Sequence, residues 1–124
     1  MRNHTFKLIT LAAALTLGAL ASASDFDDLQ NNLFTPTCSG CHGATGAAGL
    51  SLTAANAYAN LVNVASRTNG GIMRVAPGDP DNSMLIKKVE GQAGVGSRMP
   101  LGRGPLPDET IQQLRDWIAA GAPQ

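Results

Sequence analysis

Five residues, Cys38-Ser39-Gly40-Cys41-His42, constrain this chain more than any other stretch. They form the pattern C-x-x-C-H, which is the attachment signal for a c-type haem. Two residues between the cysteines place both sulfurs on one side of a tight turn, and the small Ser39 and Gly40 leave room for a porphyrin edge. The motif therefore predicts one covalent haem c with its iron. Cys38 and Cys41 are its expected attachment points, and His42 is the expected proximal iron ligand.

Three other kinds of site share parts of this motif. A zinc site needs four ligands, and two cysteines with one histidine leave the set incomplete. A thioredoxin-type C-x-x-C motif belongs to a βαβ context, which this sequence lacks. A plain disulfide between Cys38 and Cys41 stays open for an exported protein. Haem is favoured because all five motif positions, an exported compartment and the small apolar core of the chain agree with it.

Residues 1–23 have the pattern of a secretory signal peptide. Arg2 and Lys7 make a positive start, residues 8–21 are largely apolar, and Ala21-Ser22-Ala23 resembles a cleavage site. The apolar run is short for a membrane span, although an uncleaved anchor is the alternative. We expect a signal peptide at 1–23 and one domain at 24–124. The mature protein is then periplasmic or otherwise exported, with no stable membrane insertion.

Removal of the signal peptide would change the numbers of charged, histidine and aromatic residues in the chain. Without Arg2 and Lys7 the chain has seven basic and nine acidic residues, which is unlike a nucleic-acid-binding surface. His4 is also lost, so His42 becomes the only histidine and a second imidazole cannot bind the iron. Four aromatic residues remain, which is few for a domain of this length, and a buried macrocycle would complete the core.

Apolar residues recur at helical spacing in several segments, and no segment shows sustained strand alternation, so the sequence predicts an all-α fold. The expected helices cover residues 25–34, stopped or bent by Thr35-Pro36; 54–62, capped by Thr53; a segment opened by Asp79-Pro80 and ended by Gly91; and 108–120. The last helix has the clearest apolar stripe, at Ile111, Leu114, Trp117 and Ile118. Glycine-rich loops separate the helices.

A methionine is the expected sixth iron ligand, because methionine is the usual partner of histidine in cytochromes c. Met84 lies among apolar residues of a predicted helix and is interpreted as a core residue. Met73 lies in an irregular segment. Met99 precedes Pro100, which favours an extended backbone, in a long loop rich in glycine and proline. Met99 is favoured as the distal ligand, and Met73 stays open.

Several motifs resemble those of small bacterial monohaem class I cytochromes c. The motif Cys38 to Gly43 is followed by a glycine-rich loop. The pattern V-x-P-G-D-P-x-N-S-x-L is matched by Val75-Ala76-Pro77-Gly78-Asp79-Pro80-Asp81-Asn82-Ser83-Met84-Leu85. An R-M-P loop is matched by Arg98-Met99-Pro100. The final helix pattern D-E-x-I-x-x-L-x-x-W-I-x-x-G-A is matched by residues 108–122. The resemblance covers about residues 34–122. Pro107 departs from it, because the family often has Ser or Thr at that helix start.

The resemblance implies a small cytochrome c-like fold, with about four helices around one haem and with the first and last helices crossing. By the same resemblance, His42 is the proximal and Met99 the distal ligand. A closed pair of axial ligands implies a non-enzymatic electron carrier that exchanges one electron with donor and acceptor proteins. We expect a monomer with redox protein partners.

Two other functions stay open at this point. One is an enzyme or gas-binding haem protein with a labile distal ligand, although no second histidine is present for acid–base chemistry. The other is a haem-containing subunit that serves one dedicated oxidoreductase. Co-purification with such an enzyme would support the subunit.

Carbon monoxide distinguishes the carrier from the gas-binding alternative. If Met99 closes the coordination of the iron, the reduced native protein should not bind carbon monoxide readily, because no position is open. Absorption spectra of the reduced protein before and after addition of the gas measure this. Rapid, stoichiometric binding would overturn the electron-carrier assignment.

Overall fold

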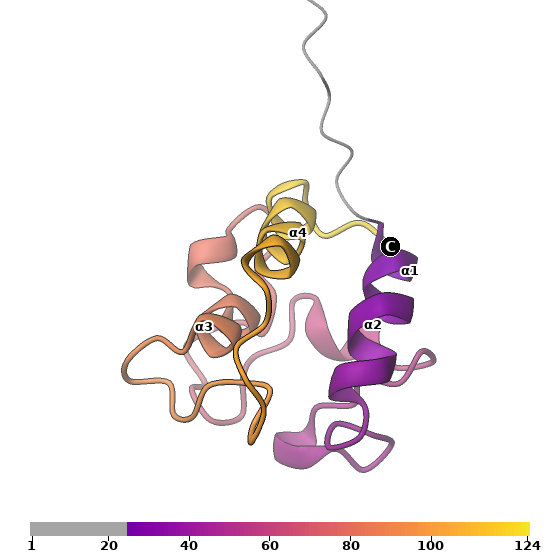
Figure 1. The fold of residues 1–124 in the computed structure, drawn as a ribbon. Coiled ribbons are helices and arrows are strands. Elements are labelled where there is room, and N and C mark those ends of the chain that lie inside the picture. Colours follow the sequence, from indigo (N-terminus) through magenta and orange to yellow (C-terminus); the bar gives the residue numbers. More distant parts are fainter. Residues whose placement is uncertain (1–24) are drawn as a thin grey trace, which may run out of the picture.

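A computed structural model describes residues 25–124, and the signal-peptide prediction at 1–23 lies outside this part. The described part contains helices and isolated β-bridges but no strand, so the predicted all-α class is confirmed (Figure 1). The elements are α1 (Phe26–Leu29), η1 (Gln30–Cys38), η2 (Ala47–Gly49), α2 (Ala57–Leu61), η3 (Pro80–Asn82), α3 (Met84–Glu90) and α4 (Asp108–Ala119). None of these helices is long and apolar enough to cross a membrane.

The first helix runs directly into the C-x-x-C-H motif. Asp25 caps α1 by accepting a hydrogen bond from the Asp28 amide at 2.8 Å. The helix then widens into the π-helical η1 and runs to Cys38, so the expectation that Thr35-Pro36 stops it before the cysteines is wrong. The Ser39 amide reaches back five residues to the Phe34 carbonyl, at 2.8 Å. A wider turn relieves the clash between the Pro36 ring and the preceding turn, so the helix continues to Cys38.

The helix α2 is shorter than predicted. It begins at Ala57 after an N-cap at Asn56, rather than at residue 54 after Thr53. The Thr53 carbonyl instead accepts hydrogen bonds from the Asn56 and Ala57 amides, at 2.9 and 2.8 Å. Thr53 therefore organises a turn that precedes the helix.

The helix predicted to open at Asp79-Pro80 is divided into two elements. Asp79 caps the short 3₁₀ segment η3, where its carboxylate accepts from the Asn82 amide at 3.2 Å. Ser83 then adopts extended backbone angles before α3 begins at Met84. Its hydroxyl donates to the Asp79 carbonyl and accepts from the Ala76 amide, both at 2.9 Å, which stabilises the break. Gly91 ends α3 in the left-handed conformation, as predicted.

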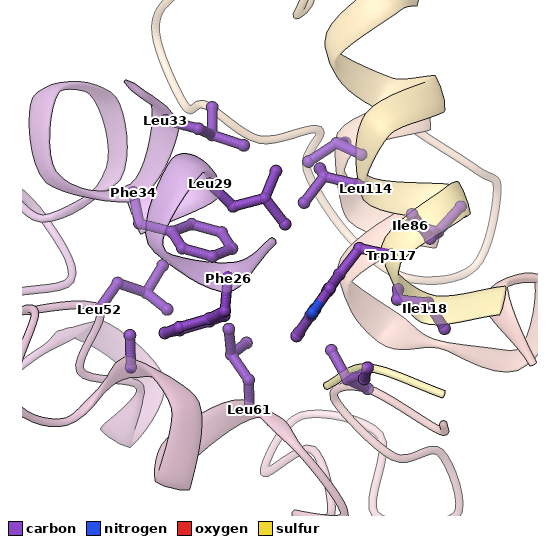
Figure 2. Packing of buried hydrophobic residues seen from close by; sticks show 14 residues of the cluster. Phe26, Leu29, Leu33, Phe34, Leu52, Leu61, Ile86, Leu114, Trp117 and Ile118 are labelled. Atoms are coloured by element: carbon purple, nitrogen blue, oxygen red, sulfur yellow. The ribbon is translucent and has the colours of Figure 1, made fainter. Parts of the chain in front are cut away.

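The core joins the first helix to the last one. Of the predicted stripe of α4, Leu114, Trp117 and Ile118 are fully buried, whereas Ile111 is half-buried against the core. The Phe26 ring lies 5.5 Å from that of Trp117, centroid to centroid, with the ring planes tilted by 39°, and Figure 2 shows both rings within the cluster of buried apolar residues. The helix α4 begins at Asp108 without a side-chain cap at Pro107.

Truncation of a buried residue of α4 should measure how much this core contributes. Leu114→Ala should lower the free energy of unfolding by about 2–5 kcal/mol, because it leaves a cavity at a fully buried position. Gln113→Ala, at the exposed neighbouring position, is the control and should change it by less than about 0.5 kcal/mol. Denaturant titration followed by circular dichroism measures both. Equal effects of the two substitutions would contradict this packing.

Candidate functional site

The C-x-x-C-H residues form one tight turn at the end of η1. The Cys38 carbonyl accepts hydrogen bonds from the amides of Cys41 and His42, at 3.2 and 2.9 Å. Both cysteines are free, so the disulfide that the sequence left open is not formed. Cys38 is half-buried against the hydrophobic core, whereas Cys41 is exposed. The turn therefore carries two free thiols and one imidazole within five consecutive residues.

The orientation of His42 is determined by the segment that follows the turn. Its Nδ1 lies 3.3 Å from the Leu50 carbonyl oxygen. A carbonyl only accepts, so this contact favours the tautomer with the proton on Nδ1 and leaves the lone pair of Nε2 free for a metal. The Leu52 amide also donates to the His42 carbonyl at 2.7 Å. Backbone and ring are thus held by one short segment, residues 50–52.

Gln30 connects this segment to the helix that carries the motif. The side chain is almost fully buried, and its Nε2 donates to the Leu52 carbonyl and to the Thr35 hydroxyl, both at 3.0 Å. Its Oε1 is buried without a partner. Our sequence prediction missed Gln30. The available signal was a polar residue directly beside Leu29, on the buried face of the helix.

The Cys38 thiol has a strongly perturbed pKa. Burial raises the pKa of Cys38 from 9.0 to about 11, and the positive charge of Arg103 offsets part of this effect. Arg103 belongs to the loop that also contains Met99. Its influence on Cys38 indicates that this loop lies near the motif, and Figure 1 shows both at the lower end of the molecule.

The three candidate methionines occupy different environments. Met84 is buried, as expected for a core residue. Met73 is 43% exposed. Met99 is half-buried, and its amide donates to the Lys88 carbonyl at 3.0 Å, which ties its loop to α3. The structure therefore brings Cys38, Cys41 and His42 into one turn and places Met99 on a separate loop at the same end.

Within residues 25–124, no three His, Cys, Asp or Glu side chains are grouped as a metal-binding cluster. One open depression in the surface is lined in part by Arg67, and another is lined in part by Arg115. Neither depression is lined by Cys38, Cys41, His42 or Met99. The fit to haem consequently rests on the chemistry of the donor set rather than on a cavity.

Comparison with known proteins gives no match: no family model, curated protein or solved structure is significantly similar to this chain.

Thiol reactivity in the haem-free chain should reflect the burial of Cys38. A thiolate, not a thiol, is the nucleophile, and with a pKa of about 11 only about one Cys38 in a thousand is ionised at pH 8. Alkylation by iodoacetamide, followed by peptide mass spectrometry, should show a Cys38 rate that rises until pH 11. A Cys38 rate that levels off near pH 9 would contradict the burial.

Proposed function

We propose that this chain is an exported monohaem cytochrome c of the class I type, which carries single electrons between redox proteins. The observation that carries the proposal is the turn at Cys38–His42, which holds two free thiols and an imidazole whose Nδ1 lies 3.3 Å from the Leu50 carbonyl oxygen. A cytochrome c-like arrangement, with the first and last helices sharing one core, is part of the proposal and is supported by the contact between Phe26 and Trp117.

The residues present fit a covalently held haem. Cys38 and Cys41 would supply the two thiols that hold the haem, His42 would offer Nε2 to the iron, and Met99 would offer its thioether sulfur as the second iron ligand. Small residues at 39, 40 and 43 keep side chains away from the turn, and a Cβ added at Gly40 would meet nothing within 4 Å. When bound, the haem supplies iron that exchanges one electron between the ferrous and ferric states.

The protein residues tune this chemistry. Donation from His42 Nδ1 to the Leu50 carbonyl makes the imidazole a stronger electron donor, which favours ferric iron. Methionine as the second ligand acts in the opposite direction and raises the potential. Two strongly held axial ligands leave no position for a substrate, so we propose a carrier and not an enzyme. Its protein partners would form small, transient contacts with a monomer.

Replacement of the proposed distal ligand tests the axial pair. Met99→Ala should abolish the absorption band of methionine-ligated ferric haem and lower the reduction potential, because the thioether favours ferrous iron. Met73→Ala is the matched control, since Met73 is an exposed methionine of another loop, and it should leave both unchanged. Absorption spectra and a redox titration measure the two effects. If Met73→Ala removes the band instead, Met73 is the ligand.

Replacement of the cysteines tests the proposal as a whole. Cys38→Ala with Cys41→Ala should give protein from which acid–acetone extracts all haem, because no thioether bonds remain. The unaltered protein should keep its haem through the same extraction. Complete loss of haem from the unaltered protein would sink the claim of covalent attachment.

A further inference from the structure

Arg74 is a buried cation that the proposed electron-transfer chemistry does not yet use. It is 7% exposed, and its guanidinium donates to three backbone carbonyls. One nitrogen, Nη1, donates to the Asn60 carbonyl at 2.8 Å, and Nη2 donates to those of Ala48 and Gly49 at 3.3 and 3.2 Å. Arg74 thereby joins η2 to the last turn of α2, which is 12 residues further along the chain. In residues 25–124 no carboxylate forms an ion pair with it.

The turn that Arg74 holds has an unfavourable backbone. Ala48 has φ of 53° and ψ of 23°, and Gly49 follows with φ of 67°. Two successive left-handed residues, one of them not glycine, persist only where neighbouring groups stabilise them. The carbonyls of these two residues accept the hydrogen bonds from Nη2 of Arg74. The guanidinium therefore stabilises the conformation that an isolated loop would avoid.

The same turn presents the hydrogen-bond acceptor of His42. The Leu50 amide donates to the Ala47 carbonyl at 3.1 Å, and the Ala47 amide donates to the Cys41 carbonyl at 3.2 Å. Leu50 follows Gly49 directly, so the direction of its carbonyl depends on the backbone angles at Ala48 and Gly49. That carbonyl is the acceptor for His42 Nδ1.

A second arginine lies nearby and provides a control. Arg67 is exposed, and a Cβ added at Gly49 would lie 2.5 Å from its Cζ, so its guanidinium lies close to the same turn. Burial and the charge of Arg67 lower the pKa of Arg74 from its ordinary value. Among the described residues, however, Arg67 donates no hydrogen bond to the turn. Both arginines are positively charged and lie close to the turn, but only Arg74 donates hydrogen bonds to its carbonyls.

We propose that Arg74 is a positioning residue for the iron-binding imidazole, because it holds the turn that presents the Leu50 carbonyl to His42. The inference rests on the proposed function. It assigns a role in the iron site to a residue that is not itself a proposed ligand.

The exchange of the His42 Nδ1 proton with solvent tests this role. It is measured by ¹⁵N NMR on the ferrous, haem-loaded protein. Arg74→Met should accelerate this exchange at least about tenfold, because the two hydrogen bonds to the turn and the one that ties it to Asn60 are lost, so the turn opens more often. Arg67→Met removes a neighbouring charge without removing those bonds, and its exchange should stay within about twofold of the unaltered protein.

Arg74→Lys keeps the charge but replaces the planar fork by a single nitrogen, and it provides a second variant if Arg74→Met does not fold. It should accelerate the exchange and also raise the reduction potential, since a weaker Nδ1 hydrogen bond makes His42 a poorer donor to ferric iron. Unchanged exchange in either folded Arg74 variant, with the haem attached, overturns this inference alone. Absence of covalent haem from the unaltered protein overturns the proposed function and this inference with it.

Discussion

The hydrogen bond between His42 Nδ1 and the Leu50 carbonyl is the interaction on which the candidate site depends. At 3.3 Å it decides which ring nitrogen carries the proton and which is free for a metal. The segment that supplies the carbonyl is held from two directions, by Gln30 of the first helix and by Arg74 of an irregular segment. Regions far apart in the sequence therefore cooperate to orient one imidazole.

The fold could be predicted well where one apolar face decides it. The stripe of α4 and the buried Met84 follow from helical spacing alone, and the structure confirms them. Helix bounds were predicted less well. Thr53 has the chemistry of an N-cap but stabilises a turn ahead of α2, and Asp79 caps only the short η3, because Ser83 separates it from α3. The continuation through Pro36 was missed because sequence rules assume α-helical turns, whereas this one is wider.

The residues of the candidate site also divide into those that the sequence identifies and those that only the fold reveals. Cys38, Cys41 and His42 are recognisable because their side chains perform the chemistry and their spacing is fixed. Leu50 was not predictable, because it contributes a backbone carbonyl that every residue type possesses. Nothing in the sequence distinguishes Arg74, and only the fold shows that its guanidinium is buried and donates to three carbonyls. The proposed pairing of His42 with Met99 still depends on a loop whose place is supported by the charge of Arg103 near Cys38.

The most direct test of the central claim is the mass of the exported protein after denaturation. The account predicts a chain heavier than its processed sequence by one haem, with the addition located on the peptide that contains Cys38 and Cys41. A chain with the mass of the unmodified sequence, its two thiols free or joined to each other, would contradict the claim that this protein is built to hold a covalent haem.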